Sequence, residues 1–282
     1  MSSPAGDVID LLHGGRPHVI GAWVLDDVVV DPGPSSCLPR LLPALEANPP
    51  RALALTHIHL DHAGASGSLV RRFPDLEVWV HERGAPHMSD PSRLLASAGR
   101  LYGDQMERLW GEMLPVPEDR LRVLRGGERI GPFEVAYTPG HASHHVSYMH
   151  EASRRVFTGD VTGVRIDGGP VMPPTPPPDI DIPAWRRSLE LIESWQPSSI
   201  AFTHFGESGD VGGHLRSLRE HLDVVERLAG ELDEEGFMAQ LGTHLRELVG
   251  TELAETYARA MPPEQSYAGL ARYIAKRDAA ES

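Results

Sequence analysis

THIHLDH, residues 56–62, places three histidines and one aspartate within six positions, directly after the apolar run at residues 52–55. The apolar run predicts a buried strand, so the motif stands where that strand ends. Neutral imidazole and carboxylate suit a borderline divalent ion such as Zn2+, with Mn2+ and Fe as alternatives. Because the motif offers more donors than one tetrahedral centre uses, it predicts two adjacent ions.

Three later segments place further candidate ligands directly after predicted strands. Apolar residues alternate or run together in each segment, as buried or half-buried strands require. A Pro-Gly pair or a single glycine breaks two of them, which lets the backbone turn sharply at the strand end. The segments are residues 133–137, 155–158 and 199–203, and they lead to His141, Asp160 and His204.

Through THIHLDH, TPGH, FTGD and THFG, in this order, the chain resembles the metallo-β-lactamase superfamily of hydrolases over roughly residues 18 to 206. The resemblance implies an α/β (α+β) fold, a four-layer αβ/βα sandwich with the ligand loops along one edge. It also implies the ligand sets. One ion is assigned to His57, His59 and His141, the other to Asp61, His62 and His204, and Asp160 bridges both.

The implied chemistry is hydrolysis by a metal-bridging hydroxide. Two ions about 3.5–4 Å apart share one water and lower its pKa from 15.7 towards about 7. The expected substrate is a small ester, thioester, lactone or phosphodiester, and Asp61 is expected to orient the hydroxide and pass on its proton. Resistance-type β-lactamases have a cysteine or a serine where this chain has Asp160, so we do not expect one.

Four neighbours of these motifs are candidates for substrate contact or for support of the ligands, namely Asp31, His144, His145 and Tyr148. Asp31 matches a superfamily aspartate that braces a turn and the ligand loop. His144 and His145 either support a ligand or leaving group, or are ordinary surface or core histidines. Tyr148 follows a pattern of some lactonases, which have an active-site tyrosine on this strand. The remaining histidines are expected to be solvated or hydrogen-bonded, and they are His13, His18, His81, His87, His150, His214, His221 and His244.

The expected organisation is a catalytic domain at residues 1–206 followed by a helical region at residues 207–282 that packs on the core. Apolar residues at spacings of three and four predict the helices of the second part. The catalytic domain carries a helical insertion at about residues 90–115, which is either a lid or a packed pair of surface helices. It also carries a Pro-rich loop at about residues 168–179, either a wall of the metal cleft or a spacer.

The C-terminal helices have three competing interpretations. In glyoxalase II such a region helps to hold glutathione, and on that interpretation the contacts come from Tyr267, Arg272, Tyr273 and Lys276. The chain lacks the Cys-Gly-basic stretch that this family has after the bridging aspartate, which weakens the comparison. A cover over the cleft and a homodimer surface are the other two interpretations.

Composition limits the partners. A formal charge of −14 disfavours a broad phosphate-binding surface, so we expect a small-molecule substrate and no nucleic acid. No apolar run reaches the roughly 18 residues needed to span a bilayer, and the first residues lack the features of a signal peptide. The single cysteine, Cys37, excludes an internal disulfide. The chain is therefore expected to act in the cytoplasm, away from membranes.

Two other function classes stay open. A mononuclear iron oxidoreductase of the persulfide dioxygenase type shares the fold and the motif, and it would be recognised by one iron per chain and oxygen uptake with a persulfide. A metal-stabilised binding protein without turnover is the third class. It leaves the spare coordination position of such a centre without a role.

Overall fold

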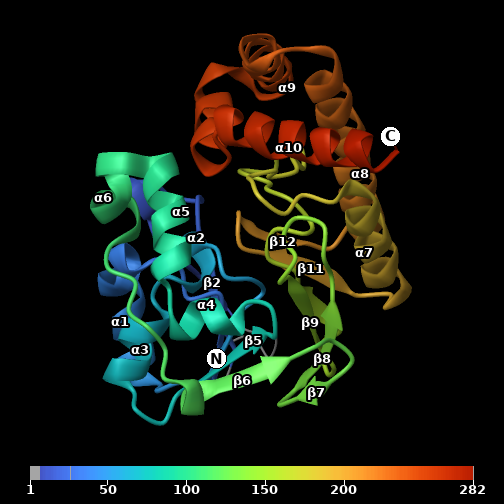
Figure 1. The fold of residues 1–282 in the computed structure, drawn as a ribbon. Coiled ribbons are helices and arrows are strands. Elements are labelled where there is room, and N and C mark those ends of the chain that lie inside the picture. Colours follow the sequence, from blue (N-terminus) through green and yellow to red (C-terminus); the bar gives the residue numbers. More distant parts are fainter. Residues whose placement is uncertain (1–6, 26, 282) are drawn as a thin grey trace.

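In this computed structural model, which describes residues 7–25 and 27–281, the strands form two six-stranded sheets (Figure 1). The first sheet has the order β1 (Asp7–Asp10), β2 (Gly21–Leu25), β3 (Val28–Val30), β4 (Ala52–Ala54), β5 (Glu77–His81) and β6 (Leu121–Leu124). The second sheet has the order β12 (Gly206–Ser208), β11 (Ser199–Phe202), β10 (Arg155–Phe157), β9 (Val146–His150), β8 (Phe133–Tyr137) and β7 (Arg129–Ile130).

Strand directions bring the predicted ligand segments to one edge of the molecule. In the first sheet β3, β4, β5 and β6 are parallel, while β1, β2 and β3 pair antiparallel. In the second sheet β10 is parallel to β11, with Phe157 opposite Ala201. Because β8 and β10 are both antiparallel to β9, they run the same way. Asp160, His141 and His204 therefore follow strands that end at a common edge.

Side chains that alternate between the two faces of each strand contribute to three hydrophobic clusters, one between the sheets and one on the outer face of each sheet. Val28 and Val30 face the second sheet, whereas Val29 faces the helices on the outer side. Trp79 likewise fills the space between the sheets, and Val78 packs outward. Side chains of a strand point alternately to its two faces, so apolar residues at every position are what a sheet covered on both sides requires.

Helices cover both outer faces. The first sheet is covered by α1 (Leu38–Ala47), α2 (Leu60–Ala63), α3 (Ser66–Arg72), α4 (Ala85–Ser89), α5 (Ser92–Tyr102) and α6 (Met106–Trp110). The second sheet is covered by α7 (Ile182–Ser194) and α8 (Val211–Glu231), while α9 (Glu234–Ala260) and α10 (Pro263–Glu281) pack against α8. Short 3-10 turns are η1 (His13–Gly15), η2 (Ser35–Cys37), η3 (Gly103–Gln105) and η4 (Glu118–Arg120).

An aspartate caps the N-terminus of three of the last four helices, α7, α8 and α9. The carboxylates of Asp181, Asp210 and Asp233 accept hydrogen bonds from the backbone N–H groups of Ala184, Gly213 and Gly236. Such caps satisfy N–H groups that have no partner within the helix. Gly250 has a φ of 77° and interrupts α9, a conformation that favours glycine.

The four-layer sandwich with C-terminal helices, predicted from the motifs, is confirmed. Leu215 and Leu222 of α8 share one cluster with Ile200 and Phe202 of β11, so α8 packs on the second sheet. The division at residue 206 stays a prediction. Figure 1 shows α9 and α10 at one end of the sandwich, beside α5 and α6. No helix within the described ranges has the length and apolar character that crossing a bilayer requires.

Candidate metal centre

The THIHLDH motif forms a loop and a short helix at the end of β4. His57 precedes the helix, His59 is its N-terminal cap, and Asp61 and His62 lie within α2. The strand therefore ends just before the motif, as predicted, and the tight turn directs four side chains to the same edge of the sheet.

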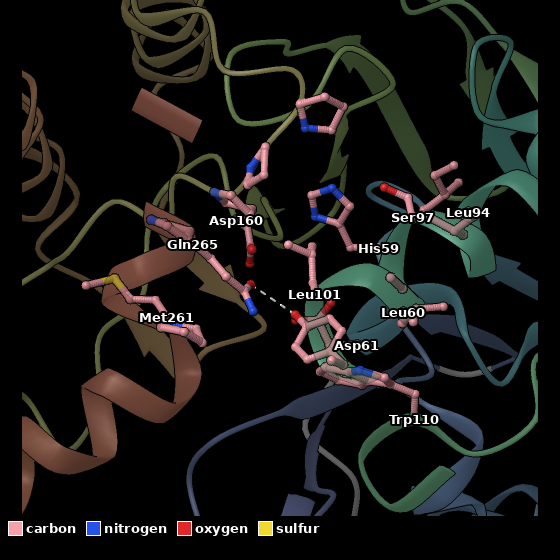
Figure 2. Close-up of a pocket in the computed structure, with 18 of the residues that line it drawn as sticks. His59, Leu60, Asp61, Leu94, Ser97, Leu101, Trp110, Asp160, Met261 and Gln265 are labelled. Carbon is pink, nitrogen blue, oxygen red and sulfur yellow. Dashed lines mark hydrogen bonds between the residues drawn. The ribbon is translucent and has the colours of Figure 1, made fainter. Parts of the chain in front are cut away.

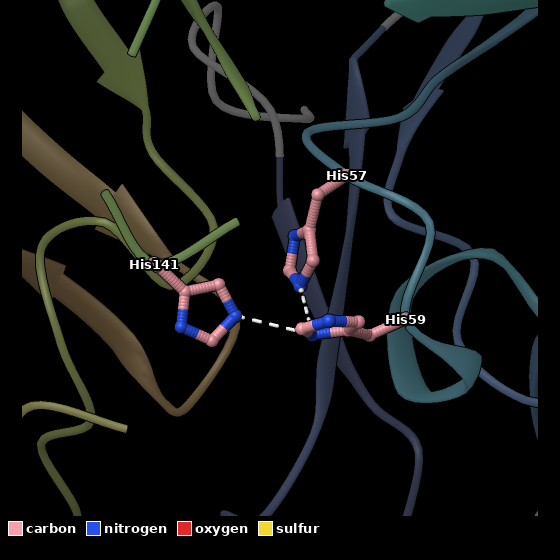
Figure 3. Close-up of side chains that lie close together, drawn as sticks. All are labelled: His57, His59 and His141. Carbon is pink, nitrogen blue, oxygen red and sulfur yellow. Dashed lines mark hydrogen bonds between the residues drawn. The ribbon is translucent and has the colours of Figure 1, made fainter. Parts of the chain in front are cut away.

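Three histidines converge into a first triad. The Nε2 atom of His57 lies 3.0 Å from Nδ1 of His59, and Nε2 of His141 lies 3.1 Å from the same Nδ1 atom (Figure 3). The rings of His57 and His141 stand nearly perpendicular, at 80°. The triad joins the β4 loop to the loop after β8, far apart in the sequence.

A second triad forms beside the first. The Oδ2 atom of Asp61 lies 3.3 Å from Nε2 of His204 and 3.7 Å from Nε2 of His62. The ligand atoms of these three residues all lie within 4.8 Å of one another, as do those of the first triad. The family resemblance implied the same division of these six residues between two ions, and the structure brings all six together in those two groups.

Asp160 stands between the two triads. Its Oδ2 atom lies 3.5 Å from Nε2 of His141, in the first triad. Its Oδ1 atom lies 3.3 Å from Nε2 of His62 and 3.5 Å from Nε2 of His204, in the second triad. One carboxylate thus presents a different oxygen to each triad, which is the arrangement that a bridging ligand needs.

The residues present fit two divalent ions. Nε2 of His62 and Oδ1 of Asp160, which lie 3.3 Å apart, are both buried, and within the described part of the chain neither makes a hydrogen bond of acceptable geometry. Buried polar atoms are normally paired, and leaving them unpaired is costly. Imidazole nitrogens and carboxylate oxygens that converge in this way are a donor set for zinc and its neighbours in the first transition series.

The far nitrogens of the histidines are fixed by buried acceptors. Nδ1 of His141 donates to the carbonyl oxygen of Pro174 at 2.9 Å, and Nδ1 of His204 donates to that of Val19 at 2.6 Å. A carbonyl accepts but cannot donate, so the proton must sit on Nδ1. The lone pair on Nε2 is then free for a metal ion, as in most metal-binding histidines.

Asp31 supports both the ligand loop and His62. Its carboxylate, fully buried, accepts from the backbone N–H of Thr56 at 2.8 Å, the Thr56 hydroxyl at 2.7 Å and the Thr203 hydroxyl at 2.9 Å. Nδ1 of His62 lies 2.8 Å from Oδ2 of the same carboxylate. Because the Thr56 hydroxyl donates to Asp31, it accepts from Nδ1 of His57 at 3.1 Å. The interpretation of Asp31 as a brace agrees with these contacts.

The two triads differ in their electrostatics. Burial, reinforced by neighbouring imidazoles, lowers the pKa of His57 well below its usual value and that of His59 to about 4. Burial also opposes the charge on His62 and His204, but the nearby carboxylates prevail and raise their pKa values. The first triad is therefore neutral at physiological pH, and the second attracts positive charge.

His144 and His145 lie beside the first triad. The His144 ring is parallel to that of His57, with centroids 6.2 Å apart, and it lines the cleft described below. His145 is fully buried, and its Nδ1 lies 2.9 Å from the Thr138 hydroxyl. His144 is thus placed to contact a substrate, whereas His145 supports the loop that carries His141.

The structure places Tyr148, one of the candidates for substrate contact or ligand support, away from the residues that line the cleft. Its side chain is fully buried between the two sheets, and its hydroxyl donates to the carbonyl oxygen of Leu55 at 2.9 Å. Tyr148 is two residues from Val146, so both side chains point to the same, inter-sheet face of β9. Tyr148 therefore acts in packing.

A cleft of about 540 Å³ opens above the two triads. His59, Asp61 and Asp160 form its floor (Figure 2). Residues 174–179 of the Pro-rich loop line it, so this loop is a wall of the cleft rather than a spacer. Further lining comes from α5, α6 and the junction of α9 with α10.

Several residues that line the cleft were not predicted from the sequence to be site residues. His13 was expected to be an ordinary histidine, yet it lines the cleft and its ring stacks on Trp110 at 5.1 Å. His87, Arg83, Arg93, Tyr102, Arg259 and Gln265 also line it. The only signal for His13 was the Gly-Gly pair that follows it, which indicates a tight turn.

The residues suggested for glutathione binding have other contacts. Arg272 and Lys276 point to the carbonyl oxygen of Pro178, at 3.3 and 3.5 Å. The Tyr267 ring packs on Phe237, with centroids 5.5 Å apart. Tyr273 packs against the hydrophobic cluster that contains Leu215 and Leu222 of α8. None of the four is among the residues that line the cleft within the described ranges. Their positions favour a packing role over glutathione binding.

The chain is similar to several known proteins. It is 30% identical over 161 residues to the metallo-beta-lactamase fold-containing protein ST1585 of Sulfurisphaera tokodaii. The matched region covers 55% of this chain and 60% of ST1585. The chain is 37% identical over 114 residues to the probable metallo-hydrolase YqgX of Bacillus subtilis, covering 40% and 49%. The matched part thus spans about half to three fifths of these relatives.

Solved structures extend the likeness to the whole fold. The crystal structure of ST1585 matches with a TM-score of 0.67 at 24% identity, over 96% of this chain and 97% of that one. The structure of TTHA1623 in a di-iron-bound form matches with a TM-score of 0.56 at 27% identity, over 71% and 93%. The model of the metallo-beta-lactamase superfamily matches residues 22–204, which contain both triads and Asp160. The chain therefore belongs to the metallo-beta-lactamase superfamily.

Proposed function

We propose that this protein is a dinuclear metal-dependent hydrolase that cleaves a small ester, thioester, lactone or phosphodiester. The observation that carries the proposal is the position of Asp160, whose two oxygens face different triads at the floor of a cleft. Similarity to a probable metallo-hydrolase supports the reaction class.

His57, His59 and His141 would hold one ion, and Asp61, His62 and His204 the other, with Asp160 shared. Zn2+ is the first candidate because imidazole and carboxylate suit it. The di-iron form of TTHA1623 makes iron the first alternative, and Mn2+ is a further one. When bound, two such ions activate water near neutral pH and polarise the bond to be cleaved.

Asp61 is the ligand best placed to move a proton. Its side chain is 22% exposed towards the cleft, compared with 6% for Asp160 and 0% for His62. Although burial opposes its charge, the imidazoles of His62 and His204 lower its pKa, so it is ionised at neutral pH. We infer that Asp61 takes up the proton released when water attacks the substrate.

The iron-dependent dioxygenase is the competing function. It needs one ion, whereas the two triads and the shared carboxylate offer seven donors from the described residues. Because the dioxygenase shares the ligand motif, the number of ions that the protein binds separates the two functions. One iron per chain with oxygen uptake from a persulfide would favour the dioxygenase instead.

The proposed partner is a small-molecule substrate, because the cleft at the metal centre has the size of a small-ligand site. Association into a homodimer is a separate proposal, which light scattering on the purified protein tests directly.

The proposal is tested with metal-loaded protein and a matched panel of phosphodiester, lactone, ester and thioester substrates. We expect chelator-sensitive hydrolysis of at least one class, with activity restored by the divalent ion. The control is the Asp160→Asn variant, which keeps the shape of the side chain but removes its charge. Equal turnover by this variant and the native protein would contradict the proposal.

A further inference from the structure

The cleft has an apolar wall built by segments that supply no metal ligand. α5 and α6 contribute Leu94, Leu101 and Trp110, and the α9–α10 junction contributes Met261. Figure 2 shows Met261 on the α10 side and Leu94 on the α5 side, with the floor residue Asp160 between them. Prolines at positions 174, 176, 177, 178 and 262 also line the cleft, together with charged residues such as Arg93 and Arg259.

Leu101 is exposed although it lies over reactive groups. Its side chain is 44% exposed, one of a few large apolar residues in the described chain with this much contact with water. Scattered exposed leucines are common on protein surfaces, but one inside a cleft at a reactive centre marks a surface that a ligand covers. The chemistry that Leu101 favours is an apolar group.

The wall is fixed to the C-terminal helices. The Tyr102 hydroxyl donates to Oε1 of Gln265 at 3.1 Å, across 163 positions of sequence (Figure 2). The Tyr102 ring also packs edge-on against Trp110, with centroids 5.0 Å apart. The insertion and the α9–α10 junction therefore form one continuous surface.

The wall is fixed to the N-terminal part of the chain as well. The Ser36 hydroxyl and Nε2 of His13 both donate to the carbonyl oxygen of Leu109, at 2.6 and 2.8 Å. The His13 ring also stacks on Trp110, with centroids 5.1 Å apart. These contacts favour a packed wall over a lid, so the apolar surface is present before the substrate binds.

We propose that the acyl part of the substrate is a medium-length apolar chain, which lies against Leu94, Leu101 and Trp110 with its carbonyl end at the metal centre. This inference rests on the proposed hydrolysis, in which the carboxylate with the same chain is a product. Such a product should bind to the metal-loaded protein, and its affinity should depend on chain length.

The experiment is calorimetric titration of metal-loaded protein with acetate, butyrate and octanoate, which needs no turnover. Each buried methylene strengthens binding by up to about fourfold. We expect octanoate to bind at least about tenfold more tightly than butyrate, because partial exposure of the chain reduces the full effect. Equal affinities for octanoate and butyrate would overturn the inference.

Two variants locate the chain. Leu101→Gln replaces the exposed leucine of the wall, and Leu248→Gln replaces a leucine of α9 that is 49% exposed and does not line the cleft. We expect Leu101→Gln to reduce the preference for octanoate over butyrate at least about threefold and Leu248→Gln to leave it unchanged. Equal effects of the two changes would refute the placement of the chain.

The titrations, taken together with the hydrolysis of the substrate panel, separate this inference from the proposed function. Tight, length-dependent binding of carboxylates without hydrolysis of any ester or thioester would support the apolar site and reject the hydrolase. Hydrolysis that is independent of acyl length, with binding also independent of length, would support the hydrolase and reject the apolar site.

Discussion

Nδ1 of His62 lies 2.8 Å from Oδ2 of Asp31, and both side chains are fully buried. Asp31 itself receives three more hydrogen bonds, from Thr56 and Thr203. Such a contact orients a metal-binding imidazole and raises its basicity. Asp31 is not one of the assigned ligands, yet its contact with Nδ1 fixes the orientation of His62 in the second triad.

Replacing Asp31 with asparagine tests this control. An amide group has only one acceptor oxygen and would turn N–H groups towards donors, so at least one buried donor loses its partner. We expect a loss of about 1–3 kcal/mol in the free energy of unfolding and about 10- to 100-fold weaker binding of the second ion. Denaturant unfolding and metal titration measure the two effects. Unchanged metal affinity would show that Asp31 does not orient His62.

Asp61→Asn separates catalysis from metal binding. The first triad lacks Asp61, so we expect much of the metal to remain while kcat falls by about 10²- to 10⁴-fold, the usual contribution of a general base. Elemental analysis alongside turnover distinguishes the two roles. A variant with native kcat would refute the proton role of Asp61.

Tyr148→Phe should leave the reaction unaffected. The change removes a buried hydrogen bond to the Leu55 carbonyl, which costs about 0.5–1.5 kcal/mol of stability. Because Tyr148 lies between the sheets and away from the cleft lining, kcat and KM should stay within about twofold of the native values. A large loss of kcat with native metal content would restore Tyr148 to the active site.

Acidification should remove the second ion before the first. Burial opposes charge on all these histidines, but the carboxylates raise the pKa values of His62 and His204, whereas those of His57 and His59 are lowered. An ion at His62 and His204 must therefore displace protons, and its affinity falls as the pH falls through their raised pKa values.

The measurement is anomalous scattering from crystals equilibrated at a series of pH values. We expect occupancy at Asp61, His62 and His204 to decrease at a higher pH than occupancy at the first triad. Earlier loss from the first triad would contradict the electrostatic difference between the two.

The ligand motifs could be found in the sequence because the backbone alone positions them. Each motif follows a strand of the sandwich, and parallel strand ends share an edge, so His57, His141 and His204 were predictable from local pattern. The Asp31 brace was predicted from the resemblance, and the structure supplies its physical reason in four converging donors.

The walls of the cleft depend on packing between distant segments. Tyr102 and Gln265 are 163 positions apart in the sequence, and no local sequence pattern predicts the hydrogen bond between them. His13 lies in a short turn after Leu12, whose φ is 49°, and sequence periodicity says nothing about the direction of such a turn. For Tyr148 the signal was present, since Val146 two residues earlier indicated a core-facing side of the strand.

The number of metal ions per chain decides whether the two triads form a dinuclear centre. Elemental analysis of purified protein, with native mass spectrometry to resolve individual species, gives this number together with the identity of the metal. We expect two divalent ions in the native protein and a loss of at least one in the Asp160→Asn variant. A single ion in fully active native protein would contradict this expectation.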